Sequence, residues 1–397
     1  MRCKNIFNCD YYHNSKMIIT LIVLKVFVIS YILLKYTSEF PLFTFFHIHY
    51  KPAIKSNVLL KQDSGGLLLK QDYLQSNSSW HKRTDKFDHL DKNIIYANFK
   101  IQRVMNRKHF NIIAIVSSAP TRSDRRTAIR DTWWTQCNSS SRVSIKCVFL
   151  TDWKDPYSNL GKSLLSEADI YNDMYFQNLT GGHDFGKRFL YHMVWSMQNF
   201  DYDYFLRLDD DYFVCMERFL YEVPMPPRKL YHWGWVHCIE NLVRPEESII
   251  LLSRDIVEIF LGQDPEKILC NRWADQMIGI WNNILNLPKF YHHDRRLHHD
   301  PPARDIDSFR TKKNICTEFI GVHGSYPIQM RTLWQHRGSS NYEKSSSLDN
   351  YSDFCWFDSI MNWENFGPDW RVEPKLCKTD PDWGGKFGSA YTGREGN

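Results

Sequence analysis

The sequence lacks the features that mark nucleic-acid-binding chains. Its 50 lysines and arginines are opposed by 45 aspartates and glutamates, which leaves a formal net charge of only +5, and no block of basic residues stands out. A nucleic-acid surface needs clustered positive charge. We therefore expect no nucleic-acid partner.

The sequence also lacks any CxxC pair, although it contains 10 cysteines. The spacing typical of structural zinc sites is thus absent. Cys3 and Cys9 precede the strongly apolar segment near the N-terminus, and the other eight are spread from Cys137 to Cys377. We expect these eight to form disulfides in an oxidising lumen, and their spacing leaves the pairing open.

One apolar run near the N-terminus is long enough to cross a membrane. Residues 17–34 are apolar apart from Lys25. Three basic residues precede the run, namely Arg2, Lys4 and Lys16. By the positive-inside rule, residues 1–16 form a cytoplasmic tail and residues 17–35 a signal anchor of type II orientation, with the rest of the chain in the lumen. A cleaved signal peptide is the alternative.

The segment after the anchor has the composition of a stem. Residues 36–107 are polar and show no sustained hydrophobic period, which is typical of a linker that holds a domain away from the membrane. The predicted luminal side contains four Asn-x-Ser/Thr sequons, at Asn77, Asn138, Asn178 and Asn350. Together with the anchor and the cysteines, the sequons predict a glycoprotein of the secretory pathway.

Residues 108–338 have the alternating pattern of an α/β domain. The predicted strands are 111–118, 143–150, 204–208 and 249–252, and the predicted helices are 124–134, 186–200, 253–261 and 272–285. Ser253 is the expected N-cap of the third helix, and Gly262 follows its end. This alternation predicts a mainly parallel sheet, with ligands at the carboxyl ends of its strands.

Residues 339–397 form a C-terminal extension of different character. A Ser-rich stretch is followed by four tryptophans, and Cys355 and Cys377 can act as a staple. So much tryptophan indicates packing against the main domain rather than a free tail.

Three consecutive acids, Asp209, Asp210 and Asp211, directly follow the predicted strand 204–208. Hard divalent cations prefer carboxylate oxygens, and a cation that bridges phosphates needs only one or two of them from the protein. Asp209 and Asp211 flank Asp210 at the DxD spacing for a metal, so one acid can bind the metal while another, Asp209 or Asp210, orients the sugar or ribose of a donor. The alternative is an acidic turn or helix cap without a ligand.

Two arginines of the first predicted helix are candidates for phosphate binding. Arg126 and Arg130 lie four residues apart on one helical face, and a guanidinium fork matches the geometry of a phosphate. A salt-bridged helix face is the alternative. Four histidines, His292, His293, His298 and His299, resemble a metal tract, but such runs are also common in exposed loops.

Several blocks, in the right order, resemble the β-1,3-galactosyltransferase family. The resemblance extends from about Asn111 to Trp334. Within the family, LYHWGW, HHDPP and the region of His323 are most similar to the branch that galactosylates the proteoglycan linker. The resembling blocks are Arg125–Trp134, Cys147–Leu150, Glu167–Thr180, Leu206–Val214, Ile250–Phe260 and Ala274–Trp281.

The resemblance implies a GT-A fold that binds a nucleotide sugar. It further implies a Golgi hexosyltransferase that transfers galactose from UDP-galactose to a glycan on protein or lipid, forming a β-1,3 linkage with inversion. Mn²⁺ is the implied cofactor, held by Asp209 and Asp211, with His323 as the late histidine that completes the metal shell. Asp275 is the implied general base for the acceptor hydroxyl.

The sequence departs from the family pattern mainly on the acceptor side. The usual Tyr-Pro-x-Tyr…Gly-x-Gly-Tyr block is missing between Trp235 and Ile249, and the usual Glu-Asp-Val is Ala274-Asp275-Gln276. Gly181-Gly182 stands where a lysine is expected. Two alternatives therefore stay open: a β-1,3-N-acetylglucosaminyltransferase on the same scaffold, and a catalytically weak glycan-binding relative.

Overall fold

The computed structural model describes residues 107–138, 142–177, 179, 184–239, 242–287, 290–298, 312–338, 348–350, 355, 372–381 and 383. All of them lie within one compact unit, residues 78–397. The predicted tail, the anchor at 17–35 and the stem up to residue 106 fall outside the described residues. Among the helices that are described, none is both long and apolar enough to cross a membrane.

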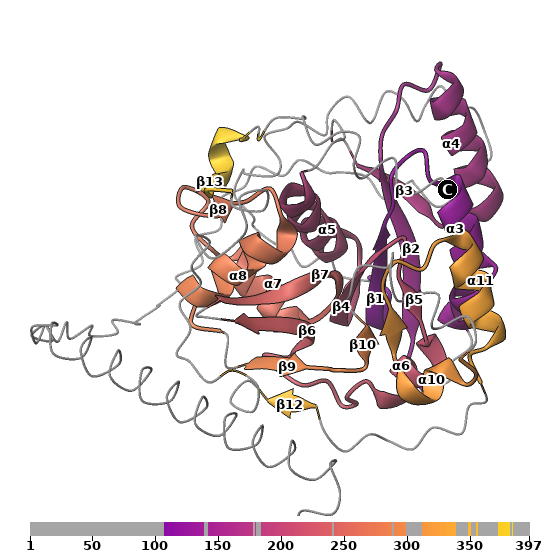
Figure 1. Cartoon of the computed structure of the whole chain (residues 1–397). Coiled ribbons are helices and arrows are strands. Elements are labelled where there is room, and N and C mark those ends of the chain that lie inside the picture. Colours follow the sequence, from indigo (N-terminus) through magenta and orange to yellow (C-terminus); the bar gives the residue numbers. More distant parts are fainter. Residues whose placement is uncertain are drawn as a thin grey trace, which may run out of the picture. The chain divides into compact units, whose positions relative to one another are not determined.

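An eight-stranded sheet forms the centre of the domain, in the order β12-β9-β6-β7-β4-β1-β2-β3 (Figure 1). Its strands are β1 His109–Ser117, β2 Ile145–Asp152, β3 Met174–Gln177, β4 Asp201–Asp209, β6 His232–Ile239, β7 Leu242–Ser253, β9 Tyr291–His293 and β12 Asp349–Asn350. The four strands β4, β1, β2 and β3 run parallel to one another. The carboxyl ends of β1 and β4 therefore meet, with Ser117 opposite Asp209.

The other half of the sheet is mixed, so the prediction of a mainly parallel sheet was only partly right. β7 is antiparallel to both β4 and β6, β12 is antiparallel to β9, and β6 is parallel to β9. The predicted strand 249–252 covers only the end of β7, and β6 was not predicted. These two strands are separated by only residues 240 and 241, and a connection that short permits only an antiparallel hairpin.

Helices cover both faces of the sheet. They are α3 Ser123–Arg130, α4 Asn159–Tyr171, α5 Phe185–Asn199, α6 Met216–Glu222, α7 Arg254–Leu261, α8 Ala274–Ile284, α10 Ile315–Glu318 and α11 Pro327–Gln335. Successive β1 residues point to opposite faces: Ile112 and Ala114 join one apolar core, and Ile113 and Ile115 join the other. α5, α7 and α8 pack on one side of the sheet and α3 and α11 on the other (Figure 1).

The predicted helices are confirmed with shifted ends. The first helix stops at Arg130, and a 3-10 helix, η2, follows at Trp133–Asn138, so the two tryptophans are not α-helical as expected. Both pack against the core below β2, where the ring of Trp134 stacks on Phe149 at 4.3 Å. Ser253 and Gly262 flank α7 as predicted.

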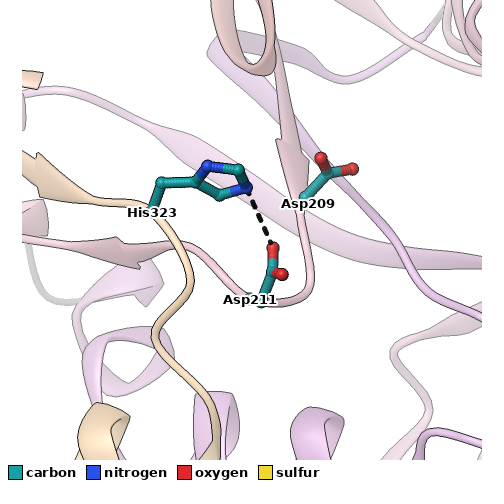
Figure 2. A group of neighbouring side chains, drawn as sticks. All are labelled: Asp209, Asp211 and His323. Atoms are coloured by element: carbon teal, nitrogen blue, oxygen red, sulfur yellow. Dashed lines mark ion pairs between the residues drawn. The ribbon is translucent and has the colours of Figure 1, made fainter. Parts of the chain in front are cut away.

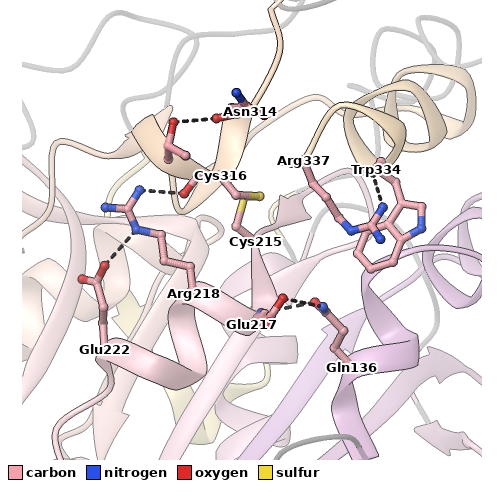
Figure 3. The surroundings of a disulfide bond; sticks show 10 residues. Gln136, Cys215, Glu217, Arg218, Glu222, Asn314, Cys316, Trp334 and Arg337 are labelled. Carbon is pink, nitrogen blue, oxygen red and sulfur yellow. Dashed lines mark hydrogen bonds and ion pairs between the residues drawn. A yellow bond between two sulfur atoms is a disulfide. The ribbon is translucent and has the colours of Figure 1, made fainter. Parts of the chain in front are cut away.

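Four disulfides join the eight cysteines that follow the stem: Cys137–Cys147, Cys215–Cys316, Cys238–Cys355 and Cys270–Cys377. The expected use of these cysteines is thus confirmed. Cys215–Cys316 joins the start of α6 to α10, and Arg218 of α6 donates to the Cys316 carbonyl at 2.7 Å (Figure 3).

Two of these disulfides attach the C-terminal extension to the main domain. Cys355 bonds to Cys238 of β6, and Cys377 bonds to Cys270 of β8 (Leu269–Cys270). β13 (Lys375–Leu376) pairs with β8, and a 3-10 helix, η5 (Cys377–Thr379), follows it. The described part of the extension is therefore packed on the domain, as its tryptophans and cysteines predict.

Candidate metal centre

The acidic turn stands where β4 ends, at the centre of the sheet. Asp209 is the last residue of β4, and Asp210 and Asp211 form the turn that follows. Nη2 of Arg207 lies 2.7 Å from Oδ1 of Asp209. Burial raises the pKa of Asp209 to about 6; Arg207 opposes this rise, and the nearby charge of Asp211 adds to it.

A small second sheet brings His323 to this turn. β5 (Phe213–Val214) follows the turn after one residue, Tyr212, and pairs with β11 (Gly321–Val322). β11 also pairs with β10 (Leu297–His298). His323 follows β11, and its Nε2 lies 3.6 Å from Oδ1 of Asp211 (Figure 2). The sheet pairing thus joins two segments that are far apart in the sequence.

The contacts around His323 fix its backbone and its ring. Its N–H donates to the His298 carbonyl at 3.1 Å, and the N–H of Ser325 donates to the Asp211 carbonyl at 2.7 Å. Its ring stacks on Tyr212 with centroids 5.8 Å apart. A Cβ on Gly321 would lie 2.3 Å from Cε1 of Tyr212, so only glycine allows this close packing.

Asp209, Asp211 and His323 can act as ligands of one cation. One ligand atom from each lies within 4.8 Å of the others, and no further cluster of this kind occurs in the part of the chain that the structure describes. Their side chains are 27%, 17% and 22% exposed, so solvent and a diphosphate can reach the cluster. Two carboxylates and one imidazole suit a divalent cation of the Mn²⁺ type better than a soft metal.

The central acid, Asp210, is buried and paired with Arg125. Its Oδ1 accepts a hydrogen bond from Nη1 of Arg125 at 2.6 Å, and both side chains are less than 10% exposed. The same Nη1 lies 3.5 Å from Oδ2 of Asp211. Arg125 was not predicted as a site residue, because the spacing of four residues marks Arg126 and Arg130, on another side of α3.

Arg126 and Arg130 belong to a buried ion-pair network on that other side. Arg126 is fully buried; it binds both oxygens of Glu167 at 2.9 and 2.7 Å and also donates to Ser118 Oγ and the carbonyls at 119 and 120. Arg130 binds Asp173 with a fork, at 2.9 and 2.8 Å, and also Glu167. These contacts favour the salt-bridged alternative, and phosphate binding by either arginine stays a prediction.

Asp275 lies in the first turn of α8 and is 4% exposed. Its Oδ2 accepts from Nη1 of Arg244 on β7, and its Oδ1 accepts from the N–H of Gln276 at 2.7 Å. None of the described contacts joins Asp275 directly to the metal cluster. The carboxylate is thus held in one orientation by an arginine, and its role as a base stays a prediction.

Glu247 connects the start of α8 with the acidic turn. Its Oε2 accepts from the N–H groups of Ala274 and Asp275 at 2.6 and 3.1 Å, and its carbonyl accepts from Arg207, the partner of Asp209. Burial, opposed by Arg207, raises the pKa of Glu247 to about 7, and Asp209 adds to the rise. Nothing in the sequence indicated a role for Glu247, because it belongs to none of the motifs that predict a metal, phosphate or catalytic site.

The histidine tract does not form a metal group within the described residues. His292 and His293 are adjacent in β9 and therefore point to opposite faces of the sheet, and His298 lies in β10. His299 lies outside the described residues. Burial lowers the pKa of both His292 and His293 to about 4, so these rings are neutral at physiological pH.

A known protein family matches the central part of the domain. Residues 124–232 match the galactosyltransferase family model. This segment is therefore similar to the galactosyltransferase family. It extends from α3 to the first residue of β6 and contains the whole acidic turn. His323 and Asp275 lie outside this segment. His323 is brought to it by the pairing of β11 with β5. Asp275 is connected to it through Glu247, which contacts both Asp275 and Arg207.

Solved structures show weaker similarity. A Pyrobaculum calidifontis mannosyltransferase in complex with GDP-mannose and Mn²⁺ has a TM-score of 0.31 and 8% identity, over 51% of this chain and 60% of its own. A glycosyltransferase involved in glycosylation of the major capsid of PBCV-1 has a TM-score of 0.31 and 13% identity, over 55% and 98%.

The galactosyltransferase LgtC, in complex with donor and acceptor sugar analogs, has a TM-score of 0.31 and 11% identity, over 53% of this chain and 86% of its own. Similarity at this level carries no further conclusion about this chain. No curated protein matches the sequence significantly.

Proposed function

We propose that this chain transfers galactose from UDP-galactose to a hydroxyl of a glycan on protein or lipid, forming a β-1,3 linkage with inversion. The observation that supports the proposal most is the joining of Asp209, Asp211 and His323 at the end of β4, within and beside the galactosyltransferase-family segment. A GT-A fold is part of the proposal, because the cluster stands at the carboxyl end of a central strand of an α/β sheet.

Asp209, Asp211 and His323 would hold the cation, which we propose to be Mn²⁺. A bound divalent cation stabilises negative charge on a departing nucleotide diphosphate. The chain itself would supply two oxygen ligands and one nitrogen ligand and would leave the other ligand positions to the donor phosphates. His323 adds a neutral ligand, which limits the negative charge that the donor diphosphate would meet.

Asp275 is the proposed general base on the acceptor side. A carboxylate there would take the proton of the attacking hydroxyl, which must approach the anomeric carbon from the face opposite the leaving diphosphate for inversion to occur. Arg244 holds the Asp275 carboxylate in place. Glu247 fixes the helix start that carries it.

We also propose that the catalytic domain is luminal and that residues 17–35 anchor it in the Golgi membrane. Four disulfides within the described residues favour an oxidising compartment, where such bonds persist. The charge asymmetry around the apolar run favours the type II orientation.

Transfer assays with the full-length chain test the proposed reaction. A panel of UDP-sugars and glycan acceptors should give transfer with UDP-galactose, loss of transfer in EDTA and recovery with Mn²⁺. Asp211→Asn should match EDTA treatment because it removes one oxygen ligand. Undiminished transfer in EDTA would contradict the metal site. Transfer from UDP-N-acetylglucosamine alone, or glycan binding without turnover, would favour the two alternatives.

A further inference from the structure

Arg125 contacts both segments that supply the metal cluster. From α3, its Nη1 donates to Asp210 at 2.6 Å and lies 3.5 Å from Asp211 in the acidic turn. Its guanidinium carbon lies 4.8 Å from the ring centroid of Tyr326, in the segment that carries His323. One guanidinium therefore bridges the turn and the segment that approaches it.

The environment of Arg125 differs from that of a donor-binding arginine. Its side chain is only 5% exposed, whereas the three cluster side chains are each at least 17% exposed. A side chain this buried is not available to an entering diphosphate. Its guanidinium instead donates a short, charge-assisted hydrogen bond to Asp210, a type of hydrogen bond that is stronger than one between neutral groups.

Two physical effects of Arg125 on a bound cation have opposite signs. Its positive charge repels a cation held by Asp211, so removal of the charge alone would tighten metal binding. Removal also leaves the Asp210 carboxylate buried without its arginine, and Oδ2 of Asp210 already has no hydrogen-bond partner in the described part of the chain. An uncompensated buried charge is strongly destabilising. We expect the turn to rearrange as a result, and Asp209 and Asp211 to move with it.

We propose that Arg125 is a positioning residue of the metal site. It holds the acidic turn against the segment that carries His323, so that Asp209, Asp211 and His323 keep the spacing that one cation needs. The inference rests on the proposed function, because it presupposes that these three residues bind a divalent cation.

Mn²⁺ binding to the full-length chain in the absence of donor tests this role without any activity assay. Free Mn²⁺ measured by electron paramagnetic resonance gives the Kd. Arg125→Gln should weaken Mn²⁺ binding by about 10-fold or more, as is typical when a group that orients a metal ligand is lost. Affinity that is unchanged or tighter would overturn the proposal, since Arg125 would then act only as a like charge.

Arg130→Gln is the matched control for a general loss of stability. Arg130 also belongs to α3 and is 8% exposed, but it pairs with Glu167 and Asp173. Thermal unfolding of both variants measures the loss of stability, and only Arg125→Gln should lose Mn²⁺ affinity. Equal losses in the two variants would overturn the positioning role.

The double variant Arg125→Gln with Asp210→Asn separates positioning from electrostatics. Replacing Asp210 removes a negative charge near the cation, so electrostatics alone predicts still weaker binding than in Arg125→Gln. If the loss of Mn²⁺ affinity in Arg125→Gln comes from the Asp210 carboxylate left without its arginine, the double variant should instead bind Mn²⁺ more tightly than Arg125→Gln alone. Additive losses would contradict the proposal.

Asp211→Asn distinguishes failure of this inference from failure of the proposed function. If this variant and the wild type bind Mn²⁺ equally, the metal site is wrong, and the inference falls with it. If Asp211→Asn loses binding while Arg125→Gln keeps it, the metal site stands and only the role of Arg125 is wrong.

Discussion

At the scale of single residues, the site pairs its carboxylates with arginines from different elements. Asp209 pairs with Arg207 of β4, Asp210 with Arg125 of α3, and Asp275 with Arg244 of β7. A buried carboxylate is costly unless it is paired and hydrogen-bonded. These arginines therefore allow several acids to stand close together, and each fixes the direction of one carboxylate.

Asp275→Asn distinguishes a base from a structural acid. Loss of a positioned base typically costs about 10²–10⁴-fold in rate. If Asp275 is only the ion-pair partner of Arg244, its replacement by asparagine should lower the stability of the fold and leave the turnover of the folded protein largely unchanged. We expect UDP binding to persist and turnover to fall by at least about 100-fold.

Steady-state kinetics and UDP titration of the Asp275→Asn variant check this prediction. Retention of more than about a tenth of wild-type turnover, well short of the expected loss, would place the base elsewhere. Arg244→Gln is the accompanying control, because it removes the partner of Asp275 and keeps the carboxylate. Its turnover should exceed that of Asp275→Asn if the carboxylate itself takes the proton.

At the scale of elements, the start of α8 depends on a glutamate from a different strand. Trp273, the N-cap residue of α8, makes no side-chain capping hydrogen bond, and Oε2 of Glu247 accepts from the first two N–H groups instead. A carboxylate at a helix N-terminus also interacts favourably with the helix dipole. β7 thus positions both the start of α8 and, through Arg244, the carboxylate of Asp275.

The raised pKa of Glu247 predicts a pH effect on stability in EDTA. Its value of about 7 in the folded chain exceeds the ordinary 4.5, so the folded state binds the proton more tightly than the unfolded state. The contribution of this proton binding to the free energy of unfolding is fully present below pH 4.5 and is lost as the pH rises through 7. Glutamine stays neutral and can accept the same hydrogen bonds. Glu247→Gln should therefore gain stability relative to wild type between pH 5 and pH 8.

Urea unfolding at pH 5, 6, 7 and 8 measures this gain. Asp209, with its pKa raised to about 6, titrates in both proteins and also adds to the raised pKa of Glu247, so the difference between them reports on Glu247 together with its interaction with Asp209. The exposed Glu217 of α6 offers a control for the replacement of a glutamate by glutamine as such. A constant difference between wild type and Glu247→Gln over this range would contradict the prediction.

The elements differ in how far the sequence predicts them. β1 and β4 were predictable because continuous apolar runs mark strands buried on both faces, and α5 and α7 because one apolar side repeats at the helical period. β5, β10 and β11 have two residues each, too few for any period. Their long-range pairing joins His323 to Asp211, so only a family resemblance could suggest that ligand.

Side-chain partners were less predictable than the elements that carry them. The acidic run and its place after a strand were evident from the sequence. The sequence did not show which of the three acids is buried, because the burial of Asp210 depends on its pairing with Arg125, 85 residues earlier in the chain. Arg126 and Arg130 have the spacing of a phosphate site, but they form ion pairs with acidic residues of α4 and of the segment just before β3.

At the scale of the whole described domain, disulfides join distant parts of the chain. The number of cysteines after the stem predicted such bonds, but the pairing depends on the fold and could not be derived from spacing. Cys377 is fully buried in the core that also contains α5, α7 and α8. Part of the C-terminal extension is therefore built into the main domain, although its composition differs.

Removal of Cys270–Cys377 should destabilise the domain more than removal of Cys137–Cys147. The first disulfide closes a sequence separation of 107 residues and the second a separation of 10. In the chain-entropy model, a longer loop restricts the unfolded chain more, by about 2 kcal/mol for this difference. Urea unfolding of the two Cys→Ser double variants gives the comparison.

The two pairs are well matched in the folded state, because all four cysteines are at most 5% exposed. Packing losses on replacement with serine should therefore be similar, and the difference should report mainly on the unfolded chain. The extension also keeps its backbone pairing between β13 and β8 and the N–H bond from Cys377 to the Ile268 carbonyl. A smaller loss of unfolding free energy for the Cys270–Cys377 variant would mean that the extension is held by these contacts and not by its crosslink.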